Sequence, residues 1–81
     1  MTWITPNLRP LGFGGADAVL ICETHLLALW NHERCRGWQL YQFCSPRNQT
    51  RTKWIAGASD ESVGWTEDQA IAWAERMIAA V

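Results

Sequence analysis

The residues AVLICETHLLALWN, numbers 18 to 31, determine the class of fold, because they fit either two strands or one buried helix. The segment 17–33 contains no Gly or Pro, and periodicity cannot distinguish a short buried strand from a buried helix. The polar triplet Glu23-Thr24-His25 interrupts the apolar run where a hairpin turn would lie. We therefore predict two antiparallel strands here, and a buried helix over 17–33 remains the alternative.

Two further strands are expected downstream of this stretch. WQLYQFC (38–44) is rich in aromatic residues and follows a glycine turn signal, whereas SPRNQT (45–50) is a cluster of turn-forming residues. TKWIAGA (52–58) has the alternation of a strand. Apolar runs joined by short loops predict an antiparallel meander of about four strands between 18 and 58.

Residues 66 to 80 fit an amphipathic helix. Thr66 and Gln69, three residues apart, match a capping box. Glu67 and Asp68 place negative charge on the first turn, where the helix dipole favours it. Apolar residues then recur at helical spacing, and this stripe consists of Ala70, Trp73, Ala74, Met77, Ile78 and Val81.

The expected fold class is α+β, an antiparallel meander sheet of about four strands with one C-terminal amphipathic helix packed on one face. The chain should form a single domain, 1–81, that begins with an irregular lead-in over 1–15. If the helix covers the sheet face that carries Trp54, Arg51 and Lys53 point to solvent.

The composition is that of a globular protein with one modest core. The chain has 81 residues, of which 48% are hydrophobic. It contains six tryptophans, and we expect most of them in the core; the alternative is that one or two lie on the surface as binding anchors. Three cysteines are too few, and odd in number, for a disulfide framework. The absence of an export signal and of a long apolar run favours a cytoplasmic protein with reduced thiols and no membrane partner.

Two Cys/His pairs flank the second apolar run with the local spacing of zinc ligands, and these residues are Cys22, His25, His32 and Cys35. As a strand, LLALWN (26–31) would hold the pairs about 20 Å apart, at roughly 3.3 Å per residue. Zinc ligands must all lie about 2.0–2.3 Å from one ion. We therefore expect no metal site, and we interpret Cys22 and Cys44 as small buried hydrophobic residues.

No catalytic arrangement accompanies the remaining nucleophiles. Cys35 lies between Arg34 and Arg36, an environment that favours a reactive thiol. Nothing in the sequence marks an oriented base or an oxyanion hole, so whether Cys35 is reactive stays open. Ser59 and Ser62 belong to a polar segment that we expect to be a solvated connection. We predict a non-enzymatic protein without a cofactor.

Charge is distributed unevenly, although the formal net charge is −1. Residues 32–53 carry five cations and one carboxylate, a net of +4, and residues 60–76 carry five carboxylates and one cation, a net of −4. The predicted binding surface combines the cations with two aromatic residues and consists of Arg34, Arg36, Trp38, Tyr41, Arg47, Arg51 and Lys53. A second, acidic surface for a basic partner consists of Asp60, Glu61, Glu67 and Asp68.

The segments GWQLYQFC, KWIAGAS and TEDQAIAWAERM together resemble the strand–strand–helix ending of small phage arm-type DNA-binding domains, in which a threonine-capped helix follows two strands. The resemblance covers about half of the chain. It implies no site residues here, because the acidic start of the helix departs from a DNA-facing surface. The small size and the lack of a catalytic signature are similar in type to accessory proteins of phages and mobile elements, including inhibitors of host defence.

The leading hypothesis is a protein-binding module, an adaptor or inhibitor, that uses the solvent-facing side of the sheet and the region from Arg34 to Lys53. Self-association as a homodimer is one form that such binding could take. The alternative is a nucleic-acid-binding domain that holds a single strand on basic and aromatic groups of an open sheet face.

Overall fold

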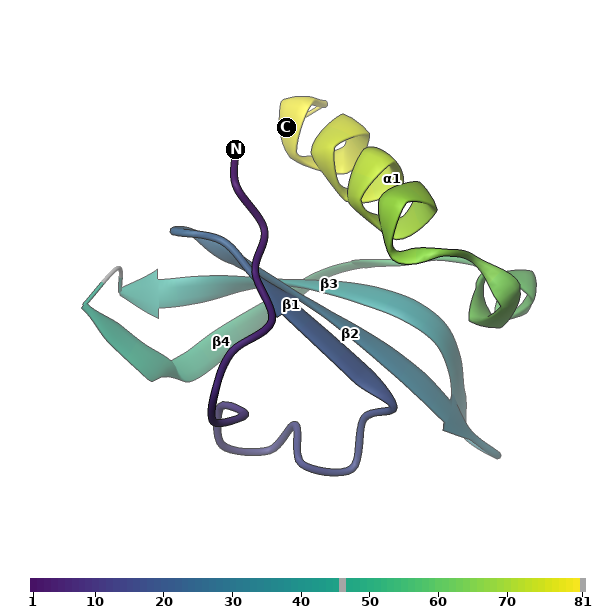
Figure 1. Ribbon diagram of the computed structural model, residues 1–81, viewed down its shortest axis with the longest axis horizontal. Helices are drawn as coiled ribbons and strands as arrows, with labels where there is room; N and C mark the ends of the chain where they lie inside the picture. Colours follow the sequence, from purple (N-terminus) through teal and green to yellow (C-terminus); the bar gives the residue numbers. More distant parts are fainter. Residues whose placement is uncertain (46, 81) are drawn as a thin grey trace.

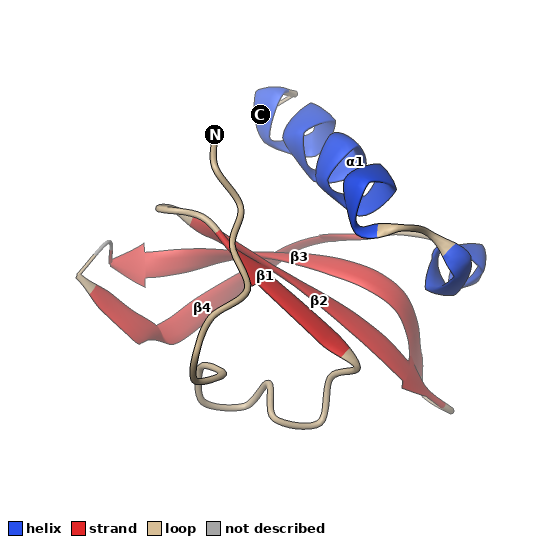
Figure 2. Cartoon of the chain, viewed as in Figure 1, coloured by secondary structure: helices blue, strands red, loops and turns tan. Residues whose placement is uncertain are grey.

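The computed structural model describes residues 1–45 and 47–80 and has the predicted α+β architecture, a four-stranded antiparallel meander with one C-terminal helix (Figure 1, Figure 2). The strands follow one another in the sheet in the order β1-β2-β3-β4. The elements are β1 (Ala18–Ile21), β2 (His25–His32), β3 (Cys35–Ser45), β4 (Asn48–Gly57), the 3₁₀ helix η1 (Asp60–Gly64) and α1 (Glu67–Ala79). Within these described residues, no helix is both long and apolar enough to cross a membrane.

The first two strands form a hairpin, so the alternative of a buried helix over 17–33 is wrong. The pairing brings Leu20 opposite Leu27 and Ile21 opposite Leu26. The backbone N–H of Cys22 donates to the His25 carbonyl over 3.0 Å, which closes a tight turn at the polar triplet. Leu26, Leu27 and Ala28 are fully buried because both faces of β2 are covered.

Both faces of the sheet carry a hydrophobic cluster, whereas the sequence indicated only one covered face. The later part of the N-terminal segment, before β1, runs below the sheet as drawn in Figure 1, and its Phe13 and Ala16 are buried against one face, which we call the lead-in face. Its members from the strands are Val19, Ile21, Leu26, Ala28 and Phe43. A short chain buries little surface on folding, so a second covered face adds stability that one helix alone does not supply.

Helix α1 covers the opposite face, which we call the helix face. Thr66 caps the helix, and both hydrogen bonds of the predicted capping box are present. Ala70, Trp73 and Ala74 are buried against the sheet, and the ring centroids of Trp73 and Trp65 lie 6.1 Å apart. Val81, the last residue of the predicted stripe, lies outside the described residues.

Trp54 lies on the lead-in face, so the condition that the helix covers the Trp54 face is not met. The register of β3 and β4 shifts, because Ala56 lies opposite Leu40 whereas Trp54 lies opposite Tyr41. The extra residue, Ile55, packs with Ala56 against the helix cluster. After an extra residue of this kind, the side chains of the strand point to the opposite faces from those that simple alternation predicts. The sequence pattern alone does not reveal this change.

The segment after β4 is not the solvated connection that the sequence suggested. Ser62 is completely buried, and its Oγ accepts a hydrogen bond of 2.8 Å from the Trp38 backbone N–H. The Trp38 carbonyl accepts from the Ala58 N–H. The N–H and C=O of Trp38 both point to the side of the sheet where β4 lies. Since β4 ends at Gly57, it offers no acceptor for the Trp38 N–H, and the Ser62 hydroxyl takes that place.

The Ser62→Ala variant tests this hydrogen bond. The change leaves a buried backbone N–H without an acceptor, so the free energy of unfolding should fall by about 1–3 kcal/mol. Urea unfolding followed by tryptophan fluorescence measures the loss. The matched control is Ser59→Ala, because Ser59 is exposed and makes no side-chain cap hydrogen bond. Equal stability of both variants would refute a structural role for Ser62.

Candidate functional site

The residues of the predicted basic region form two groups, one at each end of β3. Arg34 and Arg36 lie at the β2–β3 turn, whereas Arg47, Arg51 and Lys53 lie in the β3–β4 hairpin. These turns are at opposite ends of an 11-residue strand. All five side chains are exposed, so the chain presents two basic groups rather than one continuous surface.

Trp38, predicted as a surface contact, is a core residue with only 1% of its surface exposed. It belongs to the helix-face cluster together with Leu27 and Leu40. The neighbouring Gly37 allows Ser59 and Ser62 to approach the backbone of β3 closely. Trp38 is therefore unavailable to a partner.

Tyr41 and two tryptophans form a row across the lead-in face, which we call the aromatic row (Trp30, Tyr41 and Trp54). The Trp30 Nε1 donates to the Tyr41 hydroxyl over 3.1 Å, and Trp54 lies directly opposite Tyr41 in the sheet. Phe13 packs against Trp30 and Tyr41, and its ring centroid lies 4.8 Å from that of Tyr41 in an edge-to-face arrangement. The row thus joins strands β2, β3 and β4 and rests on the lead-in.

Trp54 is the most accessible member of the aromatic row. It is 57% exposed, whereas Trp30 and Tyr41 are half-buried. Its Nε1 donates to the Gln39 Oε1 over 2.8 Å, which fixes the orientation of the indole. The shifted register of β4 places Trp54 on the sheet face away from the helix.

Burial raises the pKa of Tyr41 above its ordinary value of 10.0. The hydrogen bond from Trp30 favours the phenolate and partly opposes this rise, and the nearby Cys35 adds to it. The neutral phenol is therefore the form that the folded protein stabilises.

Tyr41 is the single tyrosine of the chain, so its titration can be followed directly by ultraviolet difference absorbance. We expect half-ionisation above pH 10.0 in the folded protein and a return to about pH 10 in urea. Because the unfolded chain loses this proton first, the free energy of unfolding should fall as the pH rises through 10.0. An identical titration in the folded and unfolded states would contradict the burial of Tyr41.

The acidic residues lie away from the basic hairpin. Asp60 and Glu61 are in the first turn of η1, and Glu67 and Asp68 are in the first turn of α1. All four are exposed. Figure 1 shows η1 and the β3–β4 hairpin at opposite ends of the long axis, whereas the β2–β3 turn, with Arg34 and Arg36, lies at the η1 end.

The two Cys/His pairs lie at opposite ends of β2. Cys22 and His25 flank the β1–β2 turn, whereas His32 and Cys35 face each other at the β2–β3 turn. Burial lowers the pKa of His25 below 6.5, and its Nδ1 shares a 2.6 Å hydrogen bond with the Thr24 hydroxyl. Across residues 1–45 and 47–80, no three His, Cys, Asp or Glu side chains are grouped to hold an ion.

The cysteines differ in burial from the expectation. Cys22 is buried as predicted, but Cys44 is exposed, and Cys35 is intermediate. Cys44 lies near the tip of the β3–β4 hairpin, beyond the part of the sheet that the described elements cover. The prediction of a buried Cys44 is therefore wrong, because alternation along a strand determines the direction of a side chain but not whether anything packs over it.

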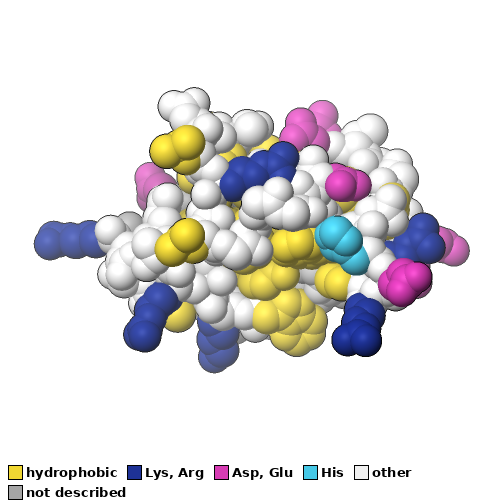
Figure 3. Space-filling model, turned by 90° about the horizontal axis from the view of Figure 1, so that it is seen from below, with side chains coloured by type: hydrophobic (Ala, Val, Ile, Leu, Met, Phe, Trp, Pro, Cys, Tyr) yellow, Lys and Arg dark blue, Asp and Glu magenta, His cyan; other side chains and the backbone are white. Residues whose placement is uncertain are grey.

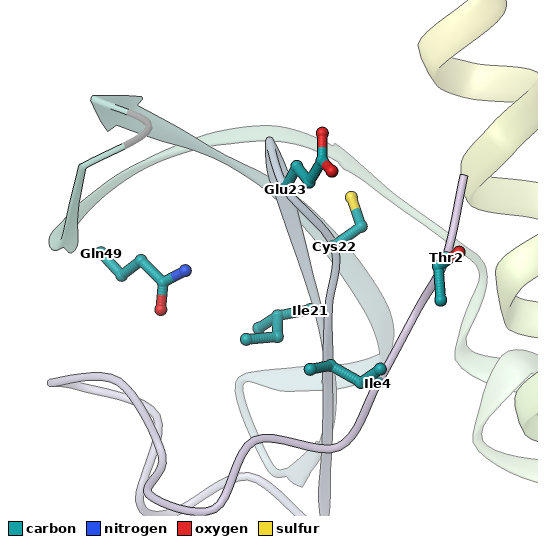
Figure 4. A pocket seen from close by; sticks show the side chains of 6 residues that line it. All are labelled: Thr2, Ile4, Ile21, Cys22, Glu23 and Gln49. Carbon is teal, nitrogen blue, oxygen red and sulfur yellow. The ribbon is translucent and has the colours of Figure 1, made fainter.

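A hollow of about 310 Å³ lies between the N-terminal segment, the β1–β2 turn and the start of β4. Figure 4 shows Ile4 and Ile21 pointing towards Gln49 across this hollow, with the Glu23 carboxylate at its rim. The floor is apolar, and its polar groups come from separate elements without converging on one point. Such a hollow fits an apolar side chain better than a reacting group.

Comparisons of the chain with models of protein families, with curated proteins and with solved structures found no match.

Proposed function

We propose that the protein is a non-enzymatic protein-binding module, an adaptor or inhibitor, that contacts its partner through the aromatic row. The observation that carries this proposal is the exposed, hydrogen-bonded indole of Trp54. Tryptophan is enriched among the residues that dominate binding energy. An indole that is already oriented loses less conformational entropy on binding than a free one does.

Further exposed hydrophobic residues outside β4 also support a protein partner. Among residues 1–45 and 47–80, the other large hydrophobic residues that are exposed belong to the N-terminal lead-in, and they are Met1, Ile4, Leu8 and Leu11. Figure 3 shows the molecule from the side of the lead-in, with hydrophobic side chains gathered in the middle and most Lys and Arg side chains around the margin. An apolar centre with a charged rim is the usual composition of a protein–protein interface.

Capture of a partner by immobilised protein tests the proposal. The wild-type protein, Trp54→Ala and the control Arg76→Ala would each be incubated with the same host lysate, since Arg76 is exposed on α1, which packs on the opposite sheet face. We expect one partner on the wild type and on the control, and about tenfold less of it on Trp54→Ala. A partner that Trp54→Ala retains in full, or no specific partner at all, would contradict the proposal.

Nucleic-acid binding is the second candidate, and the β3–β4 hairpin is the observation that favours it. Arg47, Arg51 and Lys53 are exposed there, and the sequence from 34 to 59 contains no carboxylate. Trp54 lies at the base of this hairpin, and single strands are held by basic groups beside aromatic side chains.

A salt titration with single- and double-stranded oligonucleotides tests this second function. If the hairpin binds nucleic acid, affinity should fall steeply with salt, with a logarithmic slope of no more than about three from three cations. Arg51→Ala/Lys53→Ala should lower this slope by about two, because each lost phosphate contact removes about one unit. No binding at low salt would exclude the nucleic-acid function.

A further inference from the structure

The two edges of the sheet are completed differently. At the β1 edge, Ile4 and Ile21 exchange two backbone hydrogen bonds of 2.8 Å, so the lead-in acts as a partial outer strand. β4 forms the opposite edge, and no strand lies beyond it in the described part of the chain. An open edge can accept an extended segment of another protein through main-chain hydrogen bonds.

The backbone of Thr52 points outward from this open edge. The Phe43 N–H donates to the Thr24 carbonyl, so the backbone groups of Phe43 point towards β2. Thr52 lies directly opposite Phe43 and therefore forms a non-hydrogen-bonded pair with it. The N–H and C=O of Thr52 consequently point away from β3, where an added strand would lie.

The charged residues beside Thr52 determine which kind of strand can pair with the outer edge of β4. Arg51 and Lys53 flank it, and both are exposed. If β4 paired antiparallel with a second copy of itself about Thr52, Arg51 would lie opposite Lys53 of that copy, and like charges directly opposite each other are destabilising. The edge therefore disfavours a second copy, while an acidic strand would place carboxylates beside the two cations.

We propose that the partner contributes an extended acidic segment that pairs with the outer edge of β4 around Thr52 and packs against Trp54. This inference rests on the proposed protein-binding function and specifies the chemistry of the bound segment. A nucleic acid fits the same cations less well, because it cannot continue a backbone ladder. The hairpin also has only three cations, against about six to ten phosphate contacts in strong binders.

A displayed library of random linear peptides provides the probe. Selection on the immobilised wild-type protein should enrich peptides with Asp or Glu at alternating positions, because alternate side chains of an added strand share one face. A synthetic copy of the most enriched peptide is then measured by fluorescence anisotropy. N-methylation of the amides along one edge of this peptide should abolish its binding, whereas methylation along the other edge should not.

Variants of the protein test the same geometry. Thr52→Pro removes an outward N–H without removing a bond to β3 and should weaken the peptide at least tenfold. Arg51→Ala/Lys53→Ala should weaken it about tenfold and reduce its salt dependence. The matched control, Arg34→Ala/Arg36→Ala, removes two cations at the other end of β3 and should bind as the wild type does. Circular dichroism and urea unfolding establish that each variant is folded.

The outcomes separate this inference from the proposed function. Enriched peptides that need Trp54 but are not acidic, or that bind equally well with either edge methylated, would overturn strand addition and leave the protein-binding function standing. A library without enriched peptides would also overturn strand addition, and capture of the partner then decides the proposed function independently. Preference for a single-stranded oligonucleotide over every peptide, lost in Arg51→Ala/Lys53→Ala, would overturn both.

Discussion

Among the Gly→Ala substitutions of this protein, Gly37→Ala is expected to lower the free energy of unfolding the most. Gly37 has a φ of 104°, a conformation that L side chains rarely adopt. A Cβ at this position would lie 2.5 Å from the Ser59 carbonyl oxygen and 2.5 Å from the Ser62 Oγ. The first of these is backbone and cannot rotate away, so η1 would have to move off β3.

The expected cost combines backbone strain with steric overlap and amounts to about 3 kcal/mol or more. A chain of this length has a total stability of about 4–12 kcal/mol, so the change should lower Tm by at least about 12 °C. Thermal unfolding followed by circular dichroism measures this shift.

Gly14→Ala is the matched control for the Gly37 variant. A Cβ there would have nothing within 4 Å, and its φ is not positive, so stability should change by less than about 1 kcal/mol. A Gly37→Ala protein with the stability of this control would disprove the close approach of η1 to β3.

The second large effect is expected at Trp73, which attaches α1 to the sheet. Trp73 is 8% exposed and packs within the helix-face cluster. Trp73→Ala should lower the free energy of unfolding by about 3–5 kcal/mol, because it removes a large buried side chain and leaves a cavity. Urea unfolding followed by circular dichroism measures the loss.

Trp54→Ala makes the same chemical change at an exposed position on the lead-in face and is the control for Trp73→Ala. Since Trp54 is 57% exposed, its loss should cost less than about 1 kcal/mol, although one hydrogen bond to Gln39 disappears. Equal destabilisation by the two substitutions would mean that Trp54 is structural, and this result would also weaken its proposed role in binding.

Much of the architecture was predictable because its signals are local. The apolar runs of β1 and β2 are separated by a polar triplet, and the capping box at Thr66 and Gln69 marks the start of α1. The positions of the candidate site were less predictable. Of the two aromatic residues assigned to the binding surface, Tyr41 lies on the aromatic row, whereas Trp38 is buried in the core. The sheet face on which Trp54 lies could not be predicted, because the register shift beside Tyr41 has no signature in the residue pattern.

The contrast between Trp38 and Ser62 shows the same limit. In the sequence, an aromatic residue among basic residues resembles a binding anchor, and a serine among acidic residues resembles a solvated loop. In the structure they meet in the interior, where the Ser62 hydroxyl accepts the backbone hydrogen bond of Trp38. Their burial depends on η1 packing across β3, a contact between residues 24 positions apart in the chain.

The sequence by itself determined the four-stranded meander and its C-terminal helix, because hydrophobic periodicity, turn residues and capping residues act over a few neighbours. The tertiary structure alone decided that the lead-in covers the second face of the sheet, that the basic residues separate along β3 and that Trp54 is exposed beside an open edge. These features depend on strand register and on contacts between distant segments. A one-residue shift in register moves a side chain from one face of a sheet to the other, and no local pattern records it.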